Sequence, residues 1–113
     1  MKNKIIHRNI ARIKAVSTSH GVGEKQILIT GKECLSNLTQ AAYGCLEKNE
    51  VVELHIHSTM EEFYFLLSGT IVFQLDGVEL NCNSGDFIMV PANCAHKMKA
   101  LTDTKFIYWG ISC

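Results

Sequence analysis

Two histidines and a pair of carboxylates lie close together in the middle of the chain. His55 and His57 are separated by one residue, and Glu61 and Glu62 follow soon after. Alternate side chains of a strand point to the same face, whereas residues two apart in a helix do not. The apolar residues around the histidines favour a strand, so we expect both imidazoles on one face. Together with one of the glutamates they would supply three ligands for a metal ion.

The composition is that of an ordinary soluble globular protein. The chain has 113 residues, of which 47% are hydrophobic and 19% charged, and its formal net charge is zero. This length suits one hydrophobic core, so we expect a single domain over residues 1–113. The neutral balance gives no support for nucleic-acid binding, and no apolar run approaches the ~20 residues of a membrane helix. Neither a nucleic-acid partner nor a membrane is therefore expected.

Cysteine usage and the distribution of charge add two further expectations. The five cysteines form no CxxC pair and leave an odd one, which favours reduced thiols and a cytoplasmic location over a disulfide framework. Residues 1–25 hold six Lys or Arg and one acid. We interpret this stretch as a basic N-terminal strand, residues 5–10, followed by a loop, with its lysines keeping an exposed edge soluble. Contact with phosphate or an acidic surface is the alternative.

Turn signals every few residues divide the chain into short strands. Asp76 and Gly77 form the strongest hairpin signal, and we find no long amphipathic helix. Ten strands are predicted, at residues 5–10, 26–30, 38–46, 50–57, 62–67, 70–75, 78–82, 86–90, 96–100 and 105–112. Many short strands with tight turns are typical of a β-sandwich or barrel, so the fold class is all-β.

His96 is the best candidate for a fourth ligand. It follows a strand, a proline turn and a returning strand, an arrangement that brings two segments side by side in an antiparallel sheet. We interpret His7 as a surface residue, and His20 as a loop residue for which lining a pocket mouth is the less favoured alternative. Cys94 is interpreted as a small buried cysteine in preference to a reactive thiol.

These residues give the chain its resemblance to a small single-domain cupin of the RmlC-like superfamily. The first cupin motif, G-x5-H-x-H-x(3,4)-E-x6-G, matches residues 49–69 as Asn49-x5-His55-x-His57-x4-Glu62-x6-Gly69. The second motif, G-x5-P-x-G-x2-H-x3-N, matches residues 85–100 as Gly85-x5-Pro91-x-Asn93-x2-His96-x3-Ala100. The spacing to Gly69 selects Glu62 over Glu61.

Three positions depart from the family motifs. Asn49 and Asn93 stand where the motifs have glycine, and Asn is the residue other than glycine that best tolerates a left-handed turn. Ala100 replaces the last residue of the second motif, beyond the ligands. All four expected ligand positions are therefore retained.

The resemblance implies the jelly-roll barrel of a double-stranded β-helix and one divalent transition metal ion. The ligand set that it implies is His55, His57, Glu62 and His96, which would suit Fe, Mn, Ni, Zn, Co or Cu. Strand parity places Tyr64 on the same face as Glu62, and Tyr108 could offer a second hydroxyl near the metal. Glu53 shares parity with His55 and is either an internal general base or a residue at the rim that reaches solvent. Glu53, Tyr64 and Tyr108 are the candidate catalytic residues.

Two functions follow from this resemblance. The first is a metal-dependent enzyme, of dioxygenase or isomerase/lyase type, that acts on a small organic metabolite held in the barrel. The alternative is a protein that binds or senses a sugar or organic acid in the same pocket without catalysis. Small cupins commonly pair through edge strands, so we expect a homodimer, with residues 5–10 as the edge available for pairing.

Overall fold

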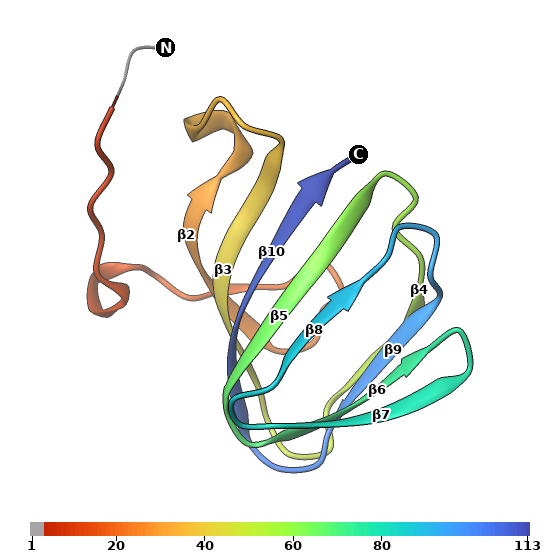
Figure 1. Cartoon of the computed structure of the whole chain (residues 1–113). Helices are drawn as coiled ribbons and strands as arrows, with labels where there is room; N and C mark the ends of the chain where they lie inside the picture. The colour runs from red at the N-terminus through yellow and green to blue at the C-terminus, as the bar shows by residue number, and fades with distance from the viewer. Residues whose placement is uncertain (1–3) are drawn as a thin grey trace.

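A computed structural model describes residues 4–113, which form ten strands and two short 3-10 turns (Figure 1). The turns are Ile10–Arg12 (η1) and Gly31–Glu33 (η2). The strands are Val16–Ser17 (β1), Glu24–Thr30 (β2), Leu38–Leu46 (β3), Val51–His55 (β4), Met60–Ser68 (β5), Thr70–Leu75 (β6), Val78–Asn83 (β7), Phe87–Val90 (β8), His96–Ala100 (β9) and Thr104–Ser112 (β10).

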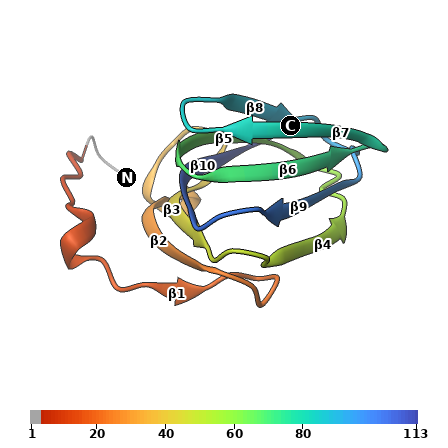
Figure 2. The same cartoon turned by 90° about the horizontal axis from the view of Figure 1, so that it is seen from below.

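The strands form two antiparallel sheets that face each other (Figures 1 and 2). One sheet has the order β1-β2-β3-β10-β5-β8, and the other has the order β4-β9-β6-β7. Alternate residues of each strand point into the space between the sheets, as in β5, where Glu62, Tyr64 and Leu66 are buried. The core includes Ile71 and Phe73, both 0% exposed. The all-β prediction is confirmed, and the structure has a strand at nine of the ten predicted positions.

The tight turns have the backbone conformations that their residues predict. Asn49 and Asn93, which stand at the glycine positions of the motifs, have φ of 73° and 65°. Asp76 and Gly77, with φ of 48° and 81°, join β6 and β7. Positive φ at both central residues is characteristic of the two-residue hairpin that matches the twist of its strands. The turns at Asn49 and Asn93 lead into β4 and β9, which carry His55 and His96.

The N-terminal strand predicted at residues 5–10 is wrong. Residues 5–9 have no regular structure, and the chain then enters η1. β1 pairs with β2 only at Glu24 and Lys25, and residues 5–9 form no strand pairing with the remainder of β2. Arg8 holds this segment against the domain by donating hydrogen bonds to the Leu28 carbonyl and the Glu33 carboxylate. Residues 1–3 of the basic stretch lie outside the described residues.

Without a strand at residues 5–10, the edge that was expected to pair two copies of the chain is absent. Ile5 remains 94% exposed, and Gln26 anchors the end of the segment by donating to the carbonyls of Ile10 and Ile13 at 2.6 and 2.8 Å. The N-terminal segment thus attaches by side-chain hydrogen bonds, because it has no ladder of backbone bonds. Figure 1 shows it lying to one side of the two sheets. Within residues 4–113, no helix is long and apolar enough to cross a membrane.

Candidate metal centre

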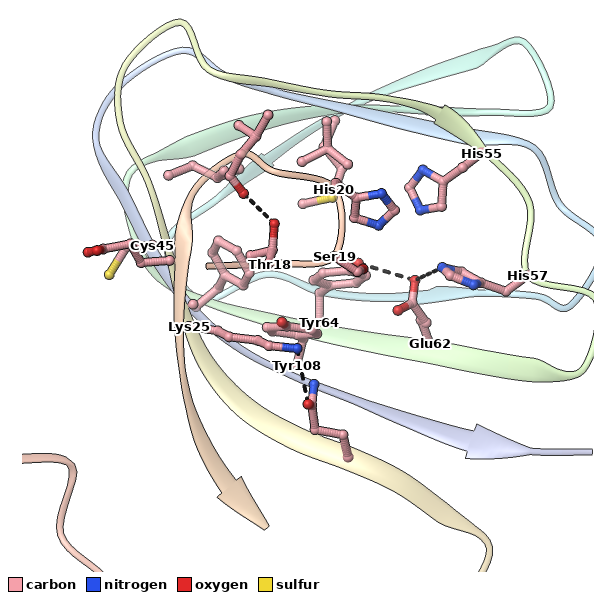
Figure 3. Close-up of a pocket in the computed structure, with 18 of the residues that line it drawn as sticks. Thr18, Ser19, His20, Lys25, Cys45, His55, His57, Glu62, Tyr64 and Tyr108 are labelled. Atoms are coloured by element: carbon pink, nitrogen blue, oxygen red, sulfur yellow. Dashed lines mark hydrogen bonds and ion pairs between the residues drawn. The ribbon is translucent and has the colours of Figure 1, made fainter. Parts of the chain in front are cut away.

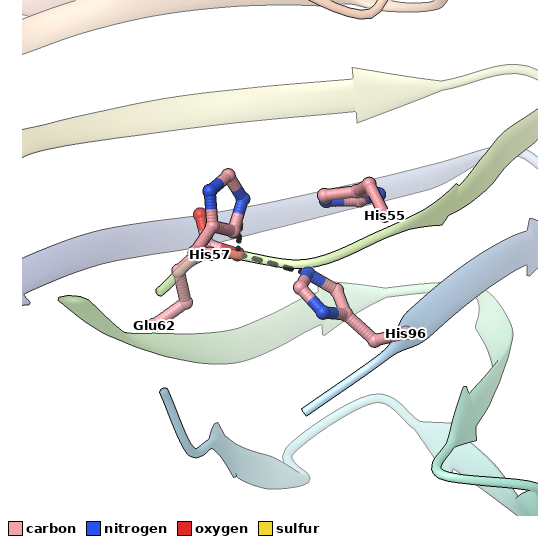
Figure 4. A group of neighbouring side chains, drawn as sticks. All are labelled: His55, His57, Glu62 and His96. Carbon is pink, nitrogen blue, oxygen red and sulfur yellow. Dashed lines mark ion pairs between the residues drawn. The ribbon is translucent and has the colours of Figure 1, made fainter. Parts of the chain in front are cut away.

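The four predicted ligands converge between the two sheets. His55 ends β4, His57 follows it, Glu62 lies in β5 and His96 begins β9 (Figure 4). One donor atom from each residue lies within 4.8 Å of the others. Three imidazole nitrogens and a carboxylate oxygen at this separation could hold one metal ion.

A β-bulge places His55 in this cluster. In the pairing of β4 with β9, Val52 faces Met98 and His55 faces His96. The chain therefore advances three residues on β4 for two on β9, which is the mark of one extra residue. The extra residue resets the alternation, so both Val52 and His55 point inward. The rings of His55 and His96 consequently lie 4.0 Å apart between centroids.

Backbone carbonyls orient two of the three imidazoles. Nδ1 of His55 lies 2.7 Å from the Glu53 carbonyl oxygen, and Nδ1 of His96 lies 2.9 Å from the Cys94 carbonyl oxygen. A carbonyl only accepts, so each Nδ1 carries the proton and each Nε2 keeps its lone pair. Histidines that bind metal ions are held in this way, with the second ring nitrogen donating to a carbonyl or carboxylate.

Two of the Nε2 atoms are buried beside Glu62 and lack a partner. Those of His57 and His96 lie 3.5 and 3.3 Å from Glu62 Oε1, but neither makes a hydrogen bond of acceptable geometry. Buried polar atoms normally have a partner, and an orphan requires an explanation. A cation among these atoms would satisfy both nitrogens and the carboxylate together, so the donor set fits a divalent transition metal.

The electrostatics of the cluster agree with this interpretation. Burial favours a neutral Glu62, but His96, His57 and the Tyr64 hydroxyl outweigh it and lower the pKa of Glu62. Burial also lowers the pKa of His55, with smaller contributions from neighbouring histidines. Burial disfavours a charged His96 as well, yet Glu62 raises the pKa of His96 overall. The carboxylate is therefore charged, and His57, His96 and the Tyr64 hydroxyl are the groups that favour its charged form.

The cluster opens into a pocket with largely apolar walls (Figure 3). The cavity is about 150 Å³, and Met98, Phe106 and Tyr108 are among the side chains that line it. Gly44 lies under the aromatic rings, and a Cβ there would come within 2.7 Å of Phe106 Cε2 and 3.1 Å of Tyr108 Cε1. The absence of a side chain at position 44 therefore lets both rings pack close to the sheet.

Both candidate tyrosines reach the pocket. Tyr64 is buried, and its hydroxyl donates a hydrogen bond to Glu62 Oε1 at 3.2 Å. Tyr108 stacks on Tyr64 with ring centroids 5.6 Å apart and an interplanar angle of 11°. Burial, together with the charge of Glu62, raises the pKa of Tyr108 to about 12. Each phenol therefore keeps its proton near neutral pH and acts as a hydrogen-bond donor.

Glu53 does not lie inside the barrel, so of its two predicted positions the structure contradicts the internal general base and agrees with a residue that reaches solvent. Its side chain is 80% exposed and points toward Lys97, with the nearest oxygen 3.9 Å from Nζ. The bulge in β4 explains the error, because the extra residue breaks the parity between Glu53 and His55. The backbone carbonyl of Glu53 still contributes to the site by accepting from His55.

His20 lines the pocket, which was the less favoured alternative for this residue in the sequence. The loop between β1 and β2 brings its ring to the pocket wall, 4.2 Å between centroids from His55 and 6.4 Å from His57 (Figure 3). Burial, reinforced by His57, lowers the pKa of His20, so this ring is neutral near the cluster. The only sequence signal for this position was the loop composition around His20, a histidine between a serine and a glycine. Cys94 is buried, as expected, and the pKa of its thiol is raised, mainly by burial.

Two facing antiparallel sheets with three histidines and a glutamate between them define a barrel domain of the cupin class. The chain belongs to the cupin family, because the family model described as "Cupin domain" matches residues 42–110. This match contains all four residues of the cluster. The sequence resemblance is thereby confirmed.

The similar proteins include enzymes and proteins named only by their fold. The chain is 35% identical over 52 residues to quercetin 2,3-dioxygenase of Bacillus subtilis (strain 168), a match that covers 46% of this chain and 15% of that protein. The solved structure of a predicted oxalate decarboxylase from Thermotoga maritima has a TM-score of 0.84 and 22% identity, and covers 96% of this chain and 100% of its own. An RmlC-like cupin from Shewanella frigidimarina NCIMB 400 has a TM-score of 0.79 and 17% identity, with coverages of 100% and 96%. At these identities the two structures confirm the fold.

Proposed function

We propose that this chain binds one divalent transition metal ion at His55, His57, Glu62 and His96 and is a metal-dependent enzyme for a small organic molecule. The observation that carries the proposal is the pair of buried, unpartnered Nε2 atoms of His57 and His96 beside Glu62. Fe, Mn, Ni, Zn, Co and Cu remain candidates, because all suit nitrogen and carboxylate ligands.

A metal ion bound here would polarise a carbonyl or activate dioxygen beside the substrate. The chain's own residues prepare the site for this chemistry. Glu62 contributes the one negative ligand, and Tyr64 holds that carboxylate in place through its hydroxyl. Tyr108 keeps its proton and can donate a hydrogen bond to an oxygen of the bound molecule. The apolar wall formed with Met98 and Phe106 limits the access of water.

The similarity to quercetin 2,3-dioxygenase supports the dioxygenase type, although the match spans a small part of that protein. An isomerase or lyase that polarises a carbonyl is the other enzymatic type that the pocket accommodates. Both types need a molecule of modest size, since a cavity of about 150 Å³ compares with one that accepts benzene.

Metal analysis of purified variants tests the ligand set. We expect about one equivalent of metal in the wild type and a loss of most of it in Glu62→Gln and His96→Ala, because each removes a ligand. Glu61→Gln is the matched control, since it neutralises the adjacent carboxylate, which lies outside the cluster, and should retain the metal. Unchanged metal content in both ligand variants would show that the assignment is wrong.

Turnover separates an enzyme from a binding protein. The metal-loaded wild type is incubated with panels of small carbonyl, phenol and carboxylic compounds, with and without oxygen. Oxygen-dependent product identifies a dioxygenase, and oxygen-independent product identifies an isomerase or lyase. Saturable binding without product in either condition would favour the non-catalytic sensor.

Two further features belong to the proposal. Because small cupins commonly pair, we infer a homodimer, although residues 5–10 do not supply the expected edge strand. Size-exclusion chromatography with light scattering checks it, and a monomer at micromolar concentration would refute it. We also infer a cytoplasmic location, which the five free thiols support. Fractionation of cells that express the chain would test this location.

A further inference from the structure

Lys25 places a positive charge on an inward face of the barrel. It lies opposite Gly44 in the pairing of β2 with β3, and both residues line the pocket. Cross-strand partners present their side chains on the same face of a sheet. The neighbouring inward positions of β3 are Ala42 and Leu46, both buried and apolar. Packing alone therefore gives no reason for a lysine at this position.

The ammonium group of Lys25 has a neutral partner. Nζ donates to Gln40 Oε1 at 3.1 Å in a partly buried environment. Among residues 4–113, no ion pair joins Lys25 to a carboxylate. Glu24 also borders the pocket, but it is exposed and pairs with Cys45 on the other face of the sheet. A half-buried charge without a counterion is unfavourable, so the pocket offers an unused site for an anion.

Lys25 and the metal cluster lie toward opposite sides of the same pocket. Figure 3 shows Lys25 beside Tyr64 and Tyr108, across from His55 and His57. With a divalent ion bound at the cluster, the charges of Glu62, Glu24 and Lys25 would leave the pocket with an excess of positive charge. Such a pocket concentrates and orients negatively charged ligands.

We propose that the substrate is a small organic acid, one end of which lies at the metal cluster while its carboxylate pairs with Lys25. The proposal rests on the proposed function, because it places a metal ion at the first end. The Gln40 amide, held by Lys25, is positioned to supply a second hydrogen bond to the same carboxylate. The cavity of about 150 Å³ limits the acid to the size of one ring or a short chain.

Matched pairs of diacids and half-amides test this inference by binding alone. The protein is loaded with Co(II), its metal content is measured, and its visible spectrum is titrated with malonate, succinate and glutarate. Each diacid is compared with its half-amide, which keeps one carboxylate for the metal and replaces the other by a neutral group. The three lengths cover different spans between the cluster and Lys25.

For the length that fits, we expect the wild type to bind the diacid about tenfold more tightly than the half-amide, the effect of one charge-assisted hydrogen bond. Lys25→Gln and Lys25→Met should reduce this preference to less than about twofold. Lys32→Gln is the control, because it removes an exposed lysine in η2, outside the pocket, and should keep the tenfold preference. Melting curves confirm that each variant is folded.

The outcomes distinguish this inference from the function on which it rests. Absence of bound Co(II) in the wild type would refute the metal site itself. Stoichiometric Co(II) without any diacid preference at the three lengths would refute the role of Lys25 and leave the metal site intact. A preference that persists in both Lys25 variants would also refute it. Since the wild-type comparison needs no variant, a poorly folded variant does not prevent the test.

Discussion

Alanine substitutions at Gly69 and Gly85 would separate the energetic cost of backbone strain from the cost of steric overlap. Both are glycines of the family motifs, and their φ angles are nearly equal, at 85° and 89°. A Cβ at Gly69 would lie 2.3 Å from the Asp103 carbonyl oxygen and 2.7 Å from Thr104 Cγ2, whereas a Cβ at Gly85 meets nothing within 4 Å. Alanine at position 85 therefore adds strain alone, and alanine at position 69 adds strain and overlap.

The expected losses follow from these two contributions. A left-handed conformation costs an L-residue about 1–2 kcal/mol, and forcing an extra methyl into a packed site costs about 1–3 kcal/mol. Gly85→Ala should therefore lower the free energy of unfolding by about 1–2 kcal/mol, and Gly69→Ala by about 2–5 kcal/mol. At about 4 °C per kcal/mol for a domain of this size, the losses in Tm are about 4–8 °C and about 8–20 °C.

Urea unfolding followed by tryptophan fluorescence, together with calorimetric Tm, measures both variants. Gly85→Asn is a useful control, because asparagine already occupies positive φ at Asn49 and Asn93 and should cost less than alanine. Equal losses in the two alanine variants would refute the argument from overlap. A Gly69→Ala protein as stable as the wild type would refute the proximity of Gly69 to Asp103.

Three other predictions concern the core, the N-terminal segment and the metal. Phe73→Ala should cost about 3–5 kcal/mol in urea unfolding, because the ring is 0% exposed and leaves a cavity; a loss below about 1 kcal/mol would contradict its place in the core. The hydrogen bond from Arg8 lowers the pKa of Glu33 to about 2. The pair is therefore intact above the ordinary pKa of 4.5 and is lost as the pH falls toward about 2. Glu33→Gln should raise hydrogen exchange in residues 4–15 at pH 7, and unchanged exchange would exclude this anchor. A chelator should lower Tm by about 10 °C if metal was at about 100 times its Kd, and His96→Ala should remove this effect.

Much of the fold could be predicted because its signals are local. Asp76 with Gly77 specifies a hairpin through two adjacent residues, and Asn49 and Asn93 specify left-handed turns without reference to the rest of the chain. The clustering of the four ligands was also predictable, because the cupin motifs combine their spacing with a known barrel. The structure brings together His55, His57, Glu62 and His96.

The errors arise where an outcome depends on distant parts of the chain. The isoleucines of residues 5–10 resemble a strand, but the segment attaches to β2 through side-chain hydrogen bonds of Arg8 and Gln26, which periodicity cannot predict. Simple alternation placed Glu53 with His55, and it could not reveal the bulge between Val52 and His55. The position of His20 depends on the path of a whole loop, for which its composition gives only weak evidence.

The metal cluster and the Lys25 site come from separable stretches of the chain. The four residues of the metal cluster lie within the matched segment 42–110, whereas Lys25 and Gln40 precede it. The pocket residues that precede this segment could therefore diverge while the metal-binding residues stay the same. A chimaera that exchanges residues 16–40 for the corresponding hairpin of another small cupin should keep its metal and acquire a different ligand preference. In this barrel, the residues that select the ligand could then change without any change in the residues that bind the metal.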